Sequence, residues 1–178
     1  MAASRPTPSA HWKSARRTAG AAPTFSMSAL GENSATARLP AAFGPHDLGS
    51  KTGLMASGVH PAELNLKSSI KDPFVLEAVA AARKSYAPYT QNIAGCAIRT
   101  AKGRTYTGRS AENAAFNPSL SALHTAIIQM ALGQPAGDNN IGRVALVERP
   151  TTASQRVECE LLLQALAADI TLEYFEAE

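Results

Sequence analysis

The chain has 178 residues, 45% of them hydrophobic, and a formal net charge of +3. This length suits one globular domain with a poorly structured extension, and no apolar run approaches the roughly 18 residues that a membrane-spanning helix needs. The basic residues that make up the excess charge precede the first acidic residue, Glu32, and are not spread over the rest of the chain. We therefore expect neither a nucleic-acid partner nor a membrane partner.

Residues 1–38 are rich in Ala, Ser, Arg, Pro and Thr and show neither helical nor strand periodicity. A composition so poor in large apolar residues cannot offset the entropy of ordering. The segment is predicted to be disordered or not authentic coding sequence, although an acid-poor segment with Arg and Ser is also typical of an organelle transit peptide. Cys96 and Cys159 have no close partner in the sequence. A reducing, cytoplasmic location is therefore expected, with both thiols acting as small hydrophobes.

Residues 39–71 are predicted to form a linker of the interdomain type. Several prolines and glycines prevent a long regular element there. Five large apolar residues nevertheless provide anchors that a free linker would not need, namely Leu39, Phe43, Leu48, Leu54 and Met55. We expect these anchors to be covered by another domain, and Phe43 to lie in that contact.

Regular periodicity begins at Asp72, which can cap a helix over residues 73–85 that starts with Pro73. Two β-rich runs, 93–100 and 104–108, flank Gly103 and predict a hairpin. Asn117 and Pro118 are predicted to open a second helix that ends near Gly133. A buried strand over 144–148, a helix over 159–166 and a last strand over 170–175 follow. The order α-β-β-α-β-α-β predicts an α/β domain over 72–178, with a sheet covered by helices on both faces.

Three separated motifs resemble the cytidine deaminase family. Pro88-Tyr89-Thr90 is similar to a turn that feeds the family's first strand, and Gly108 to Asn113 (GRSAEN) is similar to its Gly-x-Asn-x-Glu-Asn loop, with Ser110 in place of Asn. The segment LPAAFGPHDL resembles the linker between the halves of two-domain, homodimeric members, and ENAAFNPSL resembles their second half. The resemblance implies a three-layer α-β-α sandwich with a mixed sheet, here as the C-terminal domain.

Zinc deaminases need a His or Cys, a Glu two residues later, and a Pro-Cys-x-x-Cys. Three ligands leave one position for a water whose pKa the metal lowers, and the Glu moves protons. Alignment on the family motifs puts Ser121 at the first ligand, Leu123 at the Glu, and Arg156 and Cys159 at the two cysteines. His124 lies one residue beyond the Glu position and is expected to be exposed or capping. We therefore expect no catalytic residue and no zinc in this chain, although the family's catalytic domain holds zinc.

The residues after Glu-Asn reach a neighbour's active site in tetrameric family members. By that resemblance, Ala114 and Phe116 would line a partner's nucleoside pocket, unless Phe116 packs in its own core. Glu112 matches a ribose-binding Glu, but without a zinc site we interpret it as an acid that braces its loop by accepting backbone N–H groups.

Three functions remain open from the sequence. The first is a structural and interface domain of a cytidine deaminase, which converts cytidine and deoxycytidine to uridine and deoxyuridine in pyrimidine salvage. Its partner would be a catalytic domain or a second copy, and substrate would be met only through the partner's site. The second is an inactive, truncated gene fragment. The third is a stand-alone module that binds a nucleoside.

Overall fold

The computed structural model describes residues 43–50, 53–54, 63–67, 69–133 and 140–178, all within one compact unit that spans Phe43–Glu178. Its centre is a four-stranded sheet with the order β2-β1-β3-β4. The strands are β1 (Ile93–Thr100), β2 (Thr105–Arg109), β3 (Ile141–Arg149) and β4 (Leu172–Glu176). β1 is antiparallel to both β2 and β3, whereas β3 and β4 are parallel. The predicted mixed sheet is confirmed.

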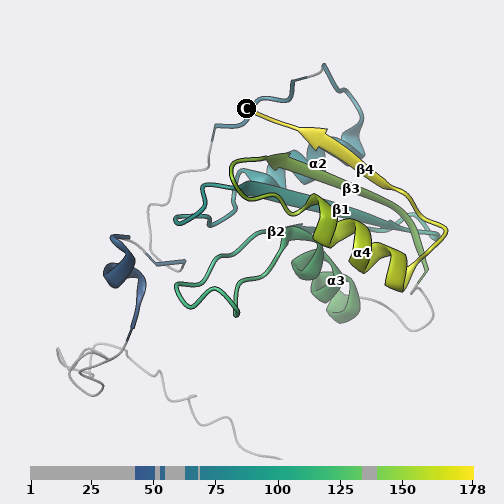
Figure 1. Cartoon of the computed structure of the whole chain (residues 1–178). Coiled ribbons are helices and arrows are strands. Elements are labelled where there is room, and N and C mark those ends of the chain that lie inside the picture. The colour runs from purple at the N-terminus through teal and green to yellow at the C-terminus, as the bar shows by residue number, and fades with distance from the viewer. Residues whose placement is uncertain (1–42, 51–52, 55–62, 68, 134–139) are drawn as a thin grey trace, which may run out of the picture. The chain divides into compact units, whose positions relative to one another are not determined.

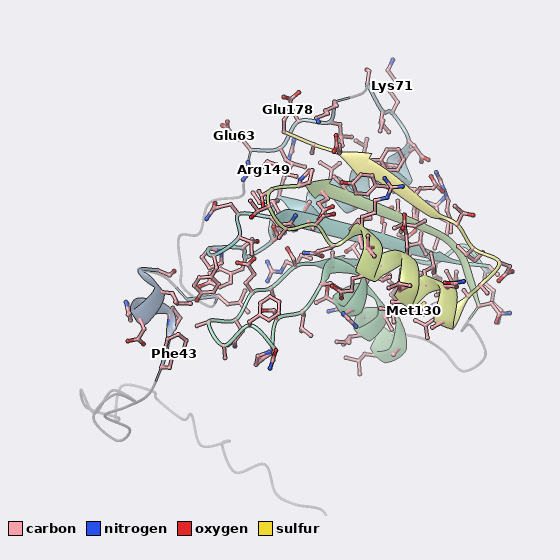
Figure 2. The ribbon with its side chains drawn as sticks, viewed as in Figure 1. Phe43, Glu63, Lys71, Met130, Arg149 and Glu178 are labelled. Carbon is pink, nitrogen blue, oxygen red and sulfur yellow. The ribbon has the colours of Figure 1, made fainter. Side chains whose placement is uncertain are left out.

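Helix α2 (Pro73–Ala82) covers one face of the sheet, and α3 (Ala122–Gly133) and α4 (Arg156–Leu166) cover the other (Figure 1). Each face has its own apolar cluster. Phe74 anchors the cluster under α2, and Leu123 and Leu146 lie in the cluster under α3 and α4. Side chains fill both layers (Figure 2). The predicted three-layer sandwich and the order α-β-β-α-β-α-β are confirmed.

The start of α2 is held by the residues that the sequence indicates. The Asp72 carboxylate accepts a hydrogen bond from the Phe74 backbone N–H at 2.9 Å, and Pro73 occupies the first helical position. Asp72 also forms an ion pair with Arg143 of β3, at 2.7 Å. The Arg143 side chain lies over the Phe74 ring, 4.6 Å from its centroid. One cap thereby joins the helix to the sheet.

Two glycines let helices approach the sheet closely. A Cβ on Gly95 of β1 would lie 2.3 Å from the carbonyl oxygen of Ala78 in α2. A Cβ on Gly108 of β2 would lie 2.2 Å from the backbone nitrogen of Ala126 in α3. Side chains at these positions would collide with helix backbone, so the glycine of the GRSAEN motif is needed for packing.

The second helix begins four residues later than the sequence predicts. The expected start at Asn117 and Pro118 is wrong, because the chain there forms successive turns around Phe116, whose φ is +60°. The Ser119 backbone N–H donates to the Phe116 carbonyl at 2.7 Å, and Leu120 pairs with Ala111 in a β-bridge. The other elements occur where they are expected, with bounds that differ by at most three residues.

One edge of the sheet is covered by a segment that the sequence predicts as linker. Leu66 forms an antiparallel bridge with Ala177, and the backbones of Asn65 and Glu178 exchange two hydrogen bonds of 2.9 Å. Leu64 is buried in the cluster under α2. The end of the 39–71 segment is therefore part of the domain core. The predicted extension 1–38 and the anchors Leu39 and Met55 lie outside the described residues.

Phe43, Leu48 and Leu54 are 59%, 48% and 43% exposed. Pro45–Leu48 forms a short 3-10 helix after Gly44, whose backbone N–H donates to the Asp47 carboxylate at 2.7 Å. Within the described ranges, no helix has the length and apolarity that crossing a membrane requires.

Candidate functional site

A cavity of about 440 Å³ opens beside the N-terminal ends of α3 and α4. Its wall includes Glu112, Phe116, Ser121 and His124, which are four of the residues singled out in the sequence, and also Glu158. Amides and hydroxyls form much of the remaining wall, contributed by Asn92, Asn113, Asn117, Gln155, Thr90, Ser119 and Ser154.

Ser121, at the first expected ligand position, serves as the cap of α3. Its Oγ accepts a hydrogen bond from the His124 backbone N–H at 3.4 Å and lies 2.8 Å from His124 Nδ1. The same Nδ1 lies 3.2 Å from the Glu158 carboxylate. Because serine and glutamate both meet one ring nitrogen, they do not form a proton relay through the two nitrogens of the imidazole. The three residues instead link the first turns of α3 and α4.

Leu123, at the expected general acid/base position, is completely buried in the cluster between the sheet and the two helices. It is not part of the cavity wall. A leucine cannot carry a proton, and this side chain belongs to the core and not to the cavity lining.

Arg156, at the first expected cysteine position, extends toward β4. Its Nε donates to the Glu160 carboxylate at 2.8 Å, one helical turn along α4. Its guanidinium carbon lies 4.8 Å from the centroid of the Tyr174 ring. These contacts fix the start of α4 against the last strand, and Arg156 does not line the cavity.

Cys159, at the second cysteine position, is completely buried. Desolvation by burial, and after it the neighbouring Glu158 carboxylate, raise the pKa of its thiol to about 12. The Leu123 backbone N–H acts in the opposite direction and lowers it. Ser121 and Arg156 stand at the other two ligand positions, so this thiol has no ligand-type partner there with which to hold a metal.

Glu112 is used by its own loop. One carboxylate oxygen accepts hydrogen bonds from the backbone N–H groups of Tyr89, at 2.8 Å, and Thr90, at 3.3 Å. The other accepts from the Thr90 hydroxyl. These are the contacts of the loop-bracing acid that we considered from the sequence, and they join the GRSAEN loop to the Pro88-Tyr89-Thr90 turn.

Phe116 lies at the tip of the turns between β2 and α3 and is 76% exposed. The alternative that it packs in its own core is therefore wrong. A left-handed φ of +60° is uncommon for a bulky residue. The loop holds it there through the Phe116 N–H, which donates to the Asn113 carbonyl at 2.9 Å. Ala114, the other residue predicted to meet a partner, belongs to the same turns.

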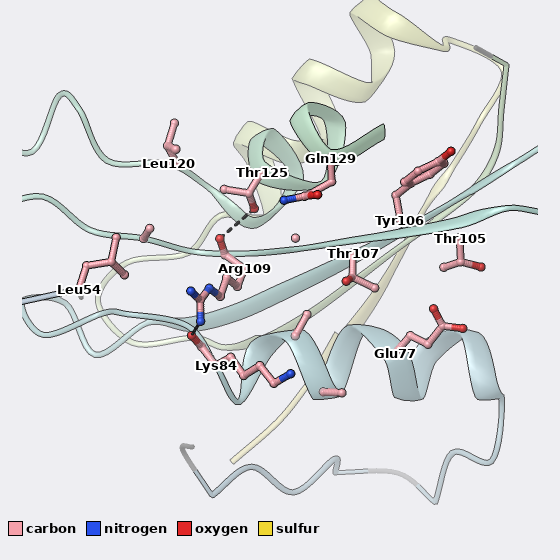
Figure 3. A pocket seen from close by; sticks show the side chains of 14 residues that line it. Leu54, Glu77, Lys84, Thr105, Tyr106, Thr107, Arg109, Leu120, Thr125 and Gln129 are labelled. Carbon is pink, nitrogen blue, oxygen red and sulfur yellow. Dashed lines mark hydrogen bonds between the residues drawn. The ribbon is translucent and has the colours of Figure 1, made fainter. Parts of the chain in front are cut away.

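A second hollow, of about 750 Å³, follows β2 between α2 and α3 (Figure 3). The Arg109 side chain donates to the Lys84 carbonyl at 2.8 Å, and the Thr125 hydroxyl donates to the Arg109 carbonyl at 2.8 Å. Leu54 and Leu120 add apolar surface at one end. None of the expected metal-ligand positions lines this groove.

Sequence reasoning missed three polar residues at the cavity, since Asn92 and Gln155 line it and Glu148 is hydrogen-bonded to both. Asn92 and Glu148 are among the few polar residues in the described part of the chain that are almost completely buried. An acidic residue at the end of the apolar run before Arg149 is the one signal that could have identified Glu148.

Comparison with known proteins shows which family this domain is similar to. Residues 36–160 match the protein family described as the cytidine and deoxycytidylate deaminase zinc-binding region. Cytidine deaminases of Vibrio parahaemolyticus, over 137 residues, and Aeromonas hydrophila, over 139 residues, are 42% and 43% identical to the chain. Each alignment covers 76% of this chain and 45% of the relative. The chain therefore spans about half the length of the curated relatives it matches.

Solved structures of cytidine deaminases are also similar to this chain. One from Burkholderia pseudomallei has a TM-score of 0.48 at 24% identity and covers 62% of this chain and 91% of its own. One from Mycobacterium leprae has a TM-score of 0.47 at 27% identity, with coverages of 58% and 87%.

The sandwich, the braced GRSAEN loop and the cavity at the two helix ends define a deaminase-type domain. With the match over residues 36–160, this chain belongs to the cytidine and deoxycytidylate deaminase family. The name of that region implies zinc, but the side chains at the three ligand positions do not fit the ion. Ser121 is a helix cap, Arg156 is a cation paired with Glu160, and Cys159 is a single buried thiol. Among the described residues, no group of three ligand-type side chains is arranged to hold a metal.

Proposed function

We propose that this chain is the C-terminal, non-catalytic domain of a two-domain cytidine deaminase, acting as a structural and interface domain. The observation that carries the proposal is the burial of Leu123 at the position where the family's chemistry needs a glutamate facing the substrate. The length of the match also supports a half-length domain, since the alignment covers 45% of the length of the Vibrio parahaemolyticus relative. The family description of a zinc-binding region favours a catalytic-type domain instead. Against that alternative, the proposal is supported by the serine, leucine and arginine that stand at three of the positions used by the family's chemistry.

The partner in this proposal is a catalytic domain of the same family, or a second copy, in the cytoplasm. Phe116 and Phe43 supply exposed aromatic surface for such a contact, at 76% and 59% exposure. An exposed aromatic held in an unfavourable backbone conformation is a feature from which function can be inferred. Cytidine or deoxycytidine would then be met at the partner's site, where an aromatic loop tip excludes water.

The test is an assay of cytidine deamination and of association. The purified chain is assayed alone and mixed with a separately produced catalytic half from one of the Vibrio relatives, and sedimentation is measured at micromolar concentration. We expect no turnover by the chain alone, together with self-association or binding of the added half.

Turnover by the chain alone would overturn the proposal. A monomer that ignores the catalytic half would overturn the interface role and favour an inactive fragment. Cytidine binding by such a monomer would favour the stand-alone nucleoside-binding module.

A further inference from the structure

Three polar residues at the cavity connect the ends of four structural elements. Asn92 and Gln155 belong to the cavity wall, and Glu148 is hydrogen-bonded to both. They are called the amide clasp below. Asn92 immediately precedes β1, Glu148 lies near the end of β3, and Gln155 immediately precedes α4. None of them is at a zinc-ligand or glutamate position, although Gln155 takes the place of the proline that precedes the first cysteine in the family's Pro-Cys-x-x-Cys motif.

Glu148 is the centre of the clasp. It is completely buried, and its carboxylate accepts hydrogen bonds from Asn92 Nδ2 at 2.8 Å and from the Gln155 backbone N–H at 2.5 Å. Its second oxygen accepts from the Ser154 hydroxyl at 2.9 Å and from the Tyr174 hydroxyl at 3.1 Å. A buried carboxylate is tolerated only when it is well hydrogen-bonded, and these donors come from three different elements.

Gln155 carries the connection to α3. Its side-chain Nε2 donates to Asn92 Oδ1 at 3.2 Å, and its Oε1 accepts from the backbone N–H of Ala122, the first residue of α3, at 2.9 Å. The first N–H groups of a helix have no partner within the helix. In this chain the Ala122 group is satisfied by a side chain from the start of α4, so the two helix ends are joined directly.

In a zinc deaminase, the ligands come from the N-terminal ends of two helices, and the metal joins those ends. The same two ends in this chain carry residues that do not fit the metal. We propose that the amide clasp takes over the metal's structural role and holds the N-terminal ends of α3 and α4 together. This inference rests on the proposed non-catalytic function, because a zinc-bearing domain would not need it.

The clasp also has a consequence for the proposed interface. The turns that carry Phe116 lead directly into Ser121 and α3. The hydrogen bond between Ala122 and Gln155 therefore holds the end of these turns against the start of α4. Gln155 is in this sense a positioning residue for the exposed aromatic.

The experiment compares thermal unfolding of the full chain with that of Gln155→Leu, which keeps the side-chain size and removes both hydrogen bonds. The matched control is Gln164→Leu, an exposed position on the same helix. We expect Gln155→Leu to lower Tm by about 4 °C or more and Gln164→Leu to leave it unchanged. Excess chelator should not change the Tm of the wild-type chain.

Amide hydrogen exchange of the wild-type chain gives a readout that needs no variant. The Ala122 amide should exchange slowly, although it has no partner within its helix, and in Gln155→Leu it should exchange at least tenfold faster while α2 amides stay protected. If Gln155→Leu does not fold, the wild-type exchange and chelator data still decide the matter.

Equal Tm values for the two leucine variants, a fast-exchanging Ala122 amide, or a Tm that falls on chelation would overturn the inference. These measurements use neither activity nor partner binding. If these measurements contradict the amide clasp, the proposed interface function is not affected. If the deamination assay contradicts the proposed function, the measurements on the clasp are not affected.

Discussion

Leu123 of α3 and Cys159 of α4 lie in one apolar cluster, both without exposed surface. By the family resemblance these two positions belong to a proton-transferring glutamate and a zinc ligand. Here one carries no titratable group, and the pKa of the other is raised by burial to about 12. In this chain, the two positions that the family uses for proton transfer and zinc binding are both part of the core.

Restoring the glutamate should damage the fold and not restore activity. Leu123→Glu places a carboxylate in the cluster under α3 and α4, and burying an unpaired charge there should lower the free energy of unfolding by about 3 kcal/mol or more. Leu132→Glu is the matched control, because Leu132 is on the same helix and 81% exposed. Denaturant unfolding measures both variants. Equal stabilities would mean that Leu123 faces the cavity after all.

Gly108 should tolerate no side chain. The Cβ of Gly108→Ala would lie 2.2 Å from the backbone nitrogen of Ala126, so α3 must move away from the sheet. We expect a loss of about 3 kcal/mol in the free energy of unfolding. Gly44→Ala serves as the control, since a Cβ there meets nothing within 4 Å. A stable Gly108→Ala variant would show that α3 does not pack this closely.

The Asp72–Arg143 pair should make stability depend on pH in the acid range. The Arg143 side chain, and then the Phe74 backbone N–H, lower the pKa of the Asp72 carboxyl below its ordinary value. The ionised form is thus favoured by folding. This contribution is complete above the unfolded pKa of about 3.9 and is lost as the pH falls through the lower folded value.

Asp72→Asn should therefore have a lower Tm than wild type at pH 7, and the difference should shrink as the pH is lowered from about 5 to 2. The exposed Asp169→Asn variant controls for the general effect of removing one acid. Thermal unfolding across this range is the measurement. A gap between Asp72→Asn and wild type that stays constant with pH would contradict the assigned ion pair.

Phe116 should matter for association and not for folding. Its side chain is largely exposed and its backbone is strained, so Phe116→Ala should leave Tm within about 2 °C of wild type. The same variant should weaken self-association, or binding of a catalytic half, at least tenfold in sedimentation. Leu132→Ala, equally exposed on α3, provides the comparison. Wild-type association by Phe116→Ala would remove Phe116 from the interface.

The fold was largely predictable because the apolar periodicity agrees with the residues that typically start helices and form turns. Asp72 and Pro73 indicate the start of α2, and Gly103, with a φ of +87°, allows the turn between β1 and β2. The start of α3 was mispredicted because an Asn-Pro pair is typical of both a helix start and a turn. The bridge between Ala111 and Leu120, a tertiary contact, decided between them.

The family motifs predict which residues stand at the ligand and glutamate positions, but not the contacts that those residues make. Motif spacing places Ser121 and Arg156 at ligand positions without indicating what they bind instead. The hydrogen bonds among Asn92, Glu148 and Gln155 join residues up to 63 positions apart. This network forms because the start of β1 lies beside the end of β3 in the sheet. The pattern of a single sequence does not show which strands are neighbours.

The zinc content of the purified chain tests the central claim most directly. The chain is incubated with zinc, dialysed against a mild chelator and analysed for metal by mass spectrometry, beside a Vibrio cytidine deaminase treated identically. The account predicts far less than one zinc per chain, because Cys159 is the one ligand-type side chain at the three ligand positions. About one zinc retained per chain would contradict it.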